Sequence, residues 1–253
     1  MYISGYCVEV ASDGTITSTK TNESECNIEI PQVITYKNGT VVYYNPVTNT
    51  KCTASQAVSV SGTKTGCMKW YAFNDKGNDR VNLLLDHNTT AKVAWVSKAD
   101  YIEAGGTEAE YNYGINNKGP ITALKQLKSD TSTWNKSINL RLIEASEIAK
   151  ITGNTNWNNN WYYFHDNTQT IYEGDAGTNK YAWLFDNTRE CTKYGCNVAD
   201  SSTYGYWTNT AHLGGISGAM DVEAYGRLLN TNVAVPGING VRPVITISKS
   251  IIS

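Results

Sequence analysis

Asp86 and His87 are adjacent residues of types that exchange protons in general acid–base catalysis. Histidine suits this role because its unperturbed pKa lies close to neutral pH. The pair ends an apolar run, Val81 to His87, that predicts a strand buried on at least one face. A histidine at the end of a strand is more often structural than catalytic, and no further residue nearby completes a site. We therefore predict a structural role for His87.

The six cysteines are the other residues whose spacing points to chemistry. They fall as three close pairs along the chain, although sequence alone does not fix which cysteine bonds to which. Sequential pairing is the simplest prediction because each disulfide would close one short loop, and it predicts an oxidising compartment. A metal site is not favoured, since no Cys-x2-Cys pair occurs and the three histidines, His87, His165 and His212, lie far apart. The predicted pairs are Cys7 with Cys26, Cys52 with Cys67, and Cys191 with Cys196.

The composition excludes one class of partner and favours one environment. With 21 basic and 23 acidic residues the net charge is −2, and no long run of like charge occurs, so we expect no nucleic-acid partner. The 17 tyrosines and 21 glycines, with many Asn and Thr residues, are more typical of an extracellular β-rich protein than of a cytosolic enzyme. No signal peptide and no apolar run of about 18 residues is present. We expect no membrane insertion by this fragment, and a secretion or anchoring segment before it in the natural protein.

Residues 1–65 are predicted to form a separate, small β-rich portion. Its strongest feature is a hairpin in which Val33–Tyr36 and Thr40–Tyr44 flank the dipeptide Asn38-Gly39. This dipeptide is typical of a type I′ turn, because both central residues of that turn need positive φ.

Residues 66–253 are predicted to form the main domain, an α+β arrangement of short strands and two helices. Runs of β-branched and aromatic residues mark the strands, and apolar side chains on one face mark the helices. The second helix is expected to end at Gly153, because glycine readily adopts the left-handed conformation of a helix C-cap. Predicted strands cover Met68–Phe73, Val81–His87, Lys92–Val96 and Tyr181–Phe185, and predicted helices cover Pro120–Lys128 and Glu144–Thr152.

The stretch Tyr204–Ile247 is the predicted functional region. Aromatic residues open it and a β-branched strand closes it, whereas the residues between follow no clear helical or strand period. A segment held by strands at both ends and irregular in its middle is typical of a surface loop region, where binding residues concentrate. Its apolar, charged and amide side chains resemble the mixture found in binding loops, and Arg242 is expected to pair with a buried carboxylate. The candidate ligand-binding residues are His212, Leu213, Ile216, Met220, Asp221, Glu223, Tyr225, Leu228, Asn230 and Asn232.

Three short landmarks resemble one known superfamily, and they occur in the same order: Arg141–Ile148, Tyr206–Thr208 and Gly240–Pro243. They resemble the Arg-Leu-Pro-Thr-x-x-Glu-Trp, Tyr-Trp-Ser/Thr and Gly-Val/Phe-Arg segments of formylglycine-generating-enzyme-like proteins. The resemblance covers roughly residues 66–250. It implies a C-type-lectin-like fold with two helices and several short antiparallel sheets, beside the N-terminal β-rich portion. Non-enzymatic members of the superfamily include variable ligand-binding proteins diversified by retroelements, and pilin-like surface proteins of gut Firmicutes.

The resemblance does not extend to enzymatic activity. The related enzymes hold copper with a cysteine pair that follows the Tyr-Trp-Ser/Thr landmark, whereas Cys191 and Cys196 precede it here and no cysteine follows residue 196. No Gly-x-Ser-x-Gly motif of a serine hydrolase occurs either. A calcium-dependent sugar site is not favoured, because Asn160 to Asp166 supplies a single acid. We therefore predict no enzyme, no catalytic residue, and no metal or other cofactor.

Two functions stay open from the sequence. The first is an extracellular or cell-surface ligand-binding protein, adhesin-like or receptor-like, that displays a variable face within residues 208–240 on a lectin-like scaffold. Its expected ligand is a protein or glycan on the surface of another cell or of a phage. The alternative is a structural surface or pilus subunit, similar to a pilin, with no diversified site.

Overall fold

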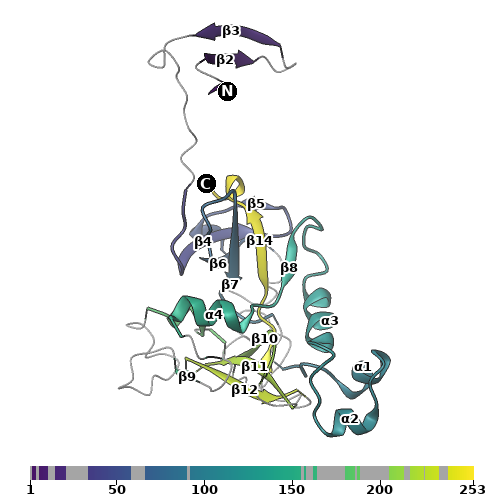
Figure 1. The fold of residues 1–253 in the computed structure, drawn as a ribbon. Coiled ribbons are helices and arrows are strands. Elements are labelled where there is room, and N and C mark those ends of the chain that lie inside the picture. Colours follow the sequence, from purple (N-terminus) through teal and green to yellow (C-terminus); the bar gives the residue numbers. More distant parts are fainter. Residues whose placement is uncertain are drawn as a thin grey trace. The chain divides into compact units, whose positions relative to one another are not determined.

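The chain forms two compact units, Met1–Ile34 and Thr35–Ser253, in a computed structural model (Figure 1). The first unit contains one antiparallel sheet of three strands, β1 (Tyr2–Ile3), β2 (Tyr6–Val10) and β3 (Ile16–Lys20). The structure describes residues 2–3, 6–10, 15–20, 34–57, 66–89, 92–154, 157, 162–163, 180–185, 187–188, 205–213, 217–224, 226–233 and 239–253.

The boundary between the two units lies after residue 34, whereas the sequence predicted a boundary after residue 65. Strand β4 (Thr40–Asn45) pairs with β6 (Met68–Phe73), so this part of the predicted N-terminal portion belongs to the main sheet. The predicted hairpin is also wrong, because residues 34–37 form no strand and only Gly39 of the Asn-Gly dipeptide has a positive φ, +84°. The Gly39 N–H donates to Ala72 O at 2.9 Å, so this turn leads the chain into pairing with β6.

A six-stranded antiparallel sheet is the larger of the two sheets that the described residues of the second unit form. The C-terminal strand lies inside it, hydrogen-bonded to β7 on one side and to β8 on the other (Figure 1). The strands predicted at 68–73 and 81–87 are confirmed, and almost all of their side chains are buried. The strand order is β5 (Thr50–Lys51), β4, β6, β7 (Arg80–Leu85), β14 (Val244–Ser248) and β8 (Asn139–Arg141).

A five-stranded sheet carries the region predicted to bind a ligand. Its neighbouring strands are antiparallel, except that β10 and β13 are parallel. The prediction of an irregular middle is wrong, because β11 and β12 form there. Every residue of β11 is buried, polar residues included, so the strand lacks the alternation by which half-buried strands are recognised. The order is β13 (Asn239–Gly240), β10 (Gly205–Ala211), β11 (Gly218–Glu223), β12 (Arg227–Asn232) and β9 (Tyr162–Tyr163).

Four α-helices lie among the described residues, where the sequence predicted two. The two predicted helices are confirmed as α3 and α4, and Gly153 ends α4 with φ +77° as expected. The missed helices are short, but both begin at a side-chain cap: Ser97 Oγ accepts from Asp100 N–H, and Thr107 Oγ1 accepts from Glu110 N–H, each at 3.2 Å. The helices are α1 (Lys98–Glu103), α2 (Glu108–Asn112), α3 (Ile121–Asp130) and α4 (Ala145–Thr152).

Two predicted strands adopt other structures. Residues 92–96 are held beside β10 by two indole N–H groups, because Trp207 Nε1 donates to Val93 O at 2.7 Å and Trp95 Nε1 donates to Thr208 O at 2.9 Å. Residues 181–185 contain a 3₁₀ helix instead of a strand. Two carbonyls of this helix accept hydrogen bonds from an arginine and not from a neighbouring strand.

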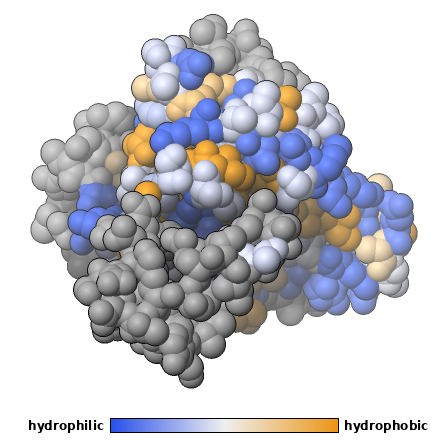
Figure 2. Space-filling model, turned by 90° about the horizontal axis from the view of Figure 1, so that it is seen from above, coloured by the Kyte–Doolittle hydropathy of each residue, from blue (hydrophilic) through white to orange (hydrophobic). Residues whose placement is uncertain are grey.

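The main core lies between the two sheets. Side chains from both sheets and from α4 form one buried cluster there, a second cluster packs around Trp70, and a third joins α3 to Trp95 and Trp207. The described surface visible in Figure 2 is mostly hydrophilic, with hydrophobic groups between the hydrophilic ones. No described helix is both long enough and apolar enough to cross a membrane. The fold is thus mixed α+β, with mostly antiparallel sheets and few helices.

One predicted disulfide is confirmed. Cys52 and Cys67 are bonded, and they close a loop between β5 and β6. Cys26, Cys191 and Cys196 lie outside the described residues, and with them the other two predicted pairs.

Arg242 has no exposed surface and lies where the two sheets meet. The predicted carboxylate partner is wrong, since the guanidinium donates to four backbone carbonyls and lies over the Tyr206 ring, 5.1 Å from its centroid. Arginine suits this position because its donors are fixed in one plane and can reach several acceptors at once. The acceptors are Leu85 O at 2.6 Å, Asp86 O at 3.0 Å, Trp183 O at 2.9 Å and Leu184 O at 2.8 Å.

Replacing Arg242 by lysine should destabilise the protein strongly. An ammonium group keeps the charge but cannot reach four carbonyls on two segments, so buried acceptors lose their donors, at a cost of about 3 kcal/mol or more. Urea denaturation measures this as a lower midpoint with an unchanged slope. The control is Arg80→Lys, because Arg80 is exposed and donates a single bond, to Thr246 O. Equal midpoints for the two variants would contradict the role given to Arg242.

Candidate functional site

The ten candidate ligand-binding residues do not share one surface. Some are buried within the five-stranded sheet, and others lie at the end of the sheet where β10 leads into β11. Met220, Asp221, Glu223 and Leu228 are buried, His212, Leu213, Asn230 and Asn232 lie at the sheet end, and Ile216 and Tyr225 lie outside the described residues.

Met220 and Leu228 are core residues, which corrects their assignment to the ligand-binding face. Alternate side chains of a strand point to opposite faces, and these two point with Tyr206 into the cluster between the sheets. They are 1% and 0% exposed, so neither can touch a macromolecular ligand. Glu223 is corrected as well, because its carboxylate is buried and forms an ion pair with Arg227.

Asp221 is also fully buried, so it is not a ligand-binding residue. Asn239 Nδ2 donates to one carboxylate oxygen at 2.9 Å, and the other oxygen has no hydrogen-bond partner among the described residues. Burial raises the pKa of Asp221 from 3.8 to about 7, and the nearby Glu223 carboxylate raises it further against the opposing effect of the Asn239 amide. Asp221 is therefore a buried acid that holds its proton up to neutral pH.

The exposed candidates meet at one end of the sheet. The His212 N–H donates to Gly218 O at 2.9 Å and closes the β10–β11 connection. A Cβ atom on Gly218 would lie 3.3 Å from His212 Cβ and 3.6 Å from Asn230 Cβ, so these two side chains flank the glycine on one face of the sheet. Asn232 pairs with Gly218 in the β11–β12 register, and its side chain is exposed.

The connection between α2 and α3 supports this end of the sheet. Asn116 Nδ2 donates to His212 O at 3.2 Å and to Gly218 O at 2.5 Å. Gly114 lies against Ser217, because a Cβ atom added to this glycine would lie only 2.6 Å from the Ser217 Cβ atom. Figure 1 shows α2 beside the ends of β11 and β12. Two segments far apart in the sequence thus form one surface.

Tyr113 and Leu213 are the most exposed large hydrophobic side chains of the described residues, at 76% and 70%. They belong to the two segments that Asn116 joins. The sequence singled out Leu213 but missed Tyr113, Asn116 and Ser217, because no periodicity predicts that the α2–α3 connection reaches β11. We define the hairpin-tip surface as Tyr113, His212, Leu213, Ser217, Asn230 and Asn232.

The chemistry of the hairpin-tip surface suits binding. It combines a phenol, a leucine side chain, an imidazole, a hydroxyl and two amides, and it contains no pair of acids and no thiol. Among the residues that the structure describes, no group of three or more His, Cys, Asp or Glu side chains could hold a metal ion. Aromatic and aliphatic groups give a binding surface its contact area, and amides give it adaptable hydrogen bonds.

Asp86 and His87 form no exposed acid–base site. Asp86 Oδ1 accepts from Tyr71 O–H at 2.7 Å and lies 3.2 Å from Lys69 Nζ, while Asn187 Nδ2 donates to Oδ2 at 2.9 Å. Burial lowers the pKa of His87 to about 4, so its imidazole is neutral at physiological pH. This burial agrees with the structural role predicted for His87.

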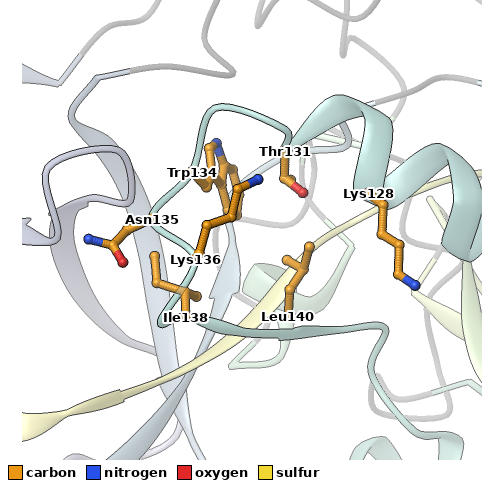
Figure 3. A pocket seen from close by; sticks show the side chains of 7 residues that line it. All are labelled: Lys128, Thr131, Trp134, Asn135, Lys136, Ile138 and Leu140. Atoms are coloured by element: carbon orange, nitrogen blue, oxygen red, sulfur yellow. The ribbon is translucent and has the colours of Figure 1, made fainter.

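A cavity of about 270 Å³ lies near the end of α3, away from the candidate residues (Figure 3). Trp134 contributes to its wall, but this indole is 4% exposed and packs edge-on against Trp70, so it offers little surface for stacking. Lys136 Nζ donates to Ser132 O at 2.9 Å and is thus already engaged. The lining residues are Lys128, Thr131, Trp134, Asn135, Lys136, Ile138 and Leu140.

Comparison with known proteins gives no relative: no model of a known protein family, no curated protein and no solved structure matches this chain. A proposal for its function therefore starts from the geometry of its own residues.

Replacing Asp221 by asparagine should stabilise the protein increasingly as the pH rises. Between pH about 4 and 7 the unfolded chain releases the Asp221 proton while the folded chain keeps it, so folding takes up a proton and the wild type loses stability as pH rises. Asparagine has nearly the same shape and no proton to lose. Urea denaturation from pH 4 to pH 8 should give curves that diverge toward pH 8.

The control for this comparison is Asp79→Asn, because Asp79 is exposed and its replacement should leave the wild-type pH dependence unchanged. Parallel curves for the wild type and Asp221→Asn over the whole range would contradict a raised pKa at Asp221.

Proposed function

We propose that this chain is an extracellular or cell-surface ligand-binding protein that presents the hairpin-tip surface on a lectin-like scaffold. The ligand is a protein or glycan on another cell or on a phage. One observation carries the proposal: the two most exposed large hydrophobic side chains, Tyr113 and Leu213, lie on segments that one buttressing residue, Asn116, holds together. An exposed hydrophobic group costs free energy in water, and a ligand that covers it recovers that cost.

Hydrogen bonds hold the strands beneath this surface in place, which favours binding because less conformational entropy is lost when a ligand binds. Thr208 Oγ1 donates to Met220 O at 2.7 Å, and Thr210 Oγ1 donates to the Glu144 carboxylate at 2.8 Å, so β10 is tied both to β11 and to the start of α4. Side chains at the tip can therefore change without loss of the strands that carry them. Such tolerance is what a variable binding face requires.

The mixed α+β architecture is compatible with the lectin-like scaffold that the sequence landmarks imply. The landmark Tyr206–Thr208 lies in β10, and Gly240–Pro243 crosses from the five-stranded sheet to the six-stranded sheet. The landmark Arg141–Ile148 runs from β8 into α4, where Arg141 and Glu147 form an ion pair at 2.6 Å. None of the three landmarks contributes a residue to the hairpin-tip surface.

The double variant Tyr113→Ser with Leu213→Asp should weaken ligand binding about tenfold or more without unfolding the protein. Both side chains are exposed, so little packing is lost, whereas the loss of two apolar contacts with a ligand costs about 1.4 kcal/mol or more. Flow cytometry of fluorescently labelled protein on a panel of intact bacterial cells and immobilised phage particles measures the binding.

The matched control is Val41→Ser with Ile102→Asp, which alters two exposed hydrophobic residues outside the hairpin-tip surface and should leave binding within about twofold of wild type. Equal losses in both double variants would point to unspecific hydrophobic adhesion. If the wild type binds no cell and no phage, the result would contradict the proposal and favour the alternative function, a structural surface or pilus subunit.

A further inference from the structure

A second cavity, of about 340 Å³, lies in the second unit among three separate segments. They are the loop before β4, the loop between β6 and β7, and the last turn of α4. We call this cavity the lysine pocket. It is lined by Tyr36, Lys37, Asn38, Asn74, Asp75, Lys76 and Lys150.

Each of the three segments contributes one lysine to the lysine pocket. Lys37, Lys76 and Lys150 are exposed, and none of their ammonium groups forms a hydrogen bond or an ion pair with a described residue. Like charges repel, so three cations around one cavity raise its positive potential unless an anion lies near. The chain has a net charge of −2, so a basic composition does not explain this grouping.

Asp75, the carboxylate that lines the cavity, and Glu147 do not neutralise these lysines, because other cations already pair with them. Asp75 Oδ1 lies 2.6 Å from Lys249 Nζ. Burial opposes the charge of Asp75, but hydrogen bonds from Lys249 and from the N–H groups of Tyr36 and Gly77 outweigh this effect and lower its pKa. Glu147 is held by two bonds from the Arg141 guanidinium, at 2.6 and 2.8 Å.

Hydrogen bonds among the segments fix the shape of the lysine pocket. Asn74 N–H donates to Asn38 Oδ1 at 2.9 Å and joins the two loops. Asn74 Nδ2 donates to Glu147 Oε1 at 3.3 Å and joins the second loop to α4. Asn74 adopts a left-handed backbone conformation, φ +49°, which asparagine tolerates better than most residues. The three lysines therefore project from a frame that exists without a ligand.

We propose that the lysine pocket binds a small ligand through an oxyanion, either a doubly charged phosphate monoester or a singly charged sulfate ester. Three lysine side chains from separate segments can surround such a group, and lysine binds phosphate as a point charge without the planar geometry that arginine demands. The volume lies near the lower end of the range for ligand pockets, which fits an oxyanion on one small organic group such as a monosaccharide. This site is separate from the hairpin-tip surface and does not depend on the function proposed for it.

Isothermal titration calorimetry at low ionic strength tests the proposal with inorganic phosphate, inorganic sulfate, glucose 6-phosphate and glucose as probes. We expect saturable one-to-one binding of the oxyanions and of glucose 6-phosphate, and none of glucose. A phosphate site should bind glucose 6-phosphate more tightly as the pH rises through about 6, where the second proton leaves the ester. A sulfate site should prefer sulfate and show no such change.

Two double variants of equal charge change distinguish the lysine pocket from general electrostatic attraction. Lys76→Gln with Lys150→Gln should weaken binding about tenfold or more. Lys128→Gln with Lys136→Gln removes the two lysines of the cavity in Figure 3 and should leave the affinity within about twofold. Urea midpoints of both variants should match the wild type, since all four side chains are at the surface. Equal weakening in both variants, or no saturable binding of any oxyanion, would overturn the proposal.

Discussion

The buried guanidinium of Arg242 is the interaction on which the second unit depends. It joins the end of β7 to the 3₁₀ helix at 182–184, and it lies over the Tyr206 ring of β10. A charge with no exposed surface is tolerated only where hydrogen bonds compensate for the lost water, and here four carbonyls accept from four of the five guanidinium N–H groups. The same four carbonyls would be buried without donors if the arginine were absent. The Arg242 guanidinium and the four carbonyls therefore hold the two sheets and the 3₁₀ helix together, because each group is a hydrogen-bond partner that the other would lack.

The sequence predicted elements that are apolar throughout or along one face, and it missed elements that are short or that bury polar side chains. Strand β6 is a mostly apolar and aromatic run, and helices α3 and α4 have an apolar face, so all three were predicted within a few residues. Strand β11 was missed because Asp221 and Glu223 are buried beside Met220, which removes the alternation of polar and apolar side chains. Helices α1 and α2 are too short to show a clear apolar face, although their Ser97 and Thr107 caps could have located them.

Four of the ten candidate ligand-binding residues are buried, and the hairpin-tip surface includes residues that the sequence did not single out. Chemical type alone does not tell which side of a strand is exposed, so Leu228 and Leu213 looked equivalent in the sequence, whereas one is in the core and the other is 70% exposed. Tyr113 could not be found because its place depends on Asn116 bonding to carbonyls some hundred positions later in the chain. Long-range contacts of this kind follow from the packed fold and not from any local pattern.

A binding face that varies on a fixed scaffold is the central claim, and sequence variation within a natural population tests it most directly. Deep sequencing of codons 207–240 of the intact locus should show substitutions concentrated at 212, 213, 217, 230 and 232. Codons 220, 221, 223 and 228, whose side chains are buried, should stay constant with 207. Uniformly low variation, or substitutions spread evenly over buried and exposed codons, would contradict a diversified hairpin-tip surface and leave a fixed-ligand or structural role.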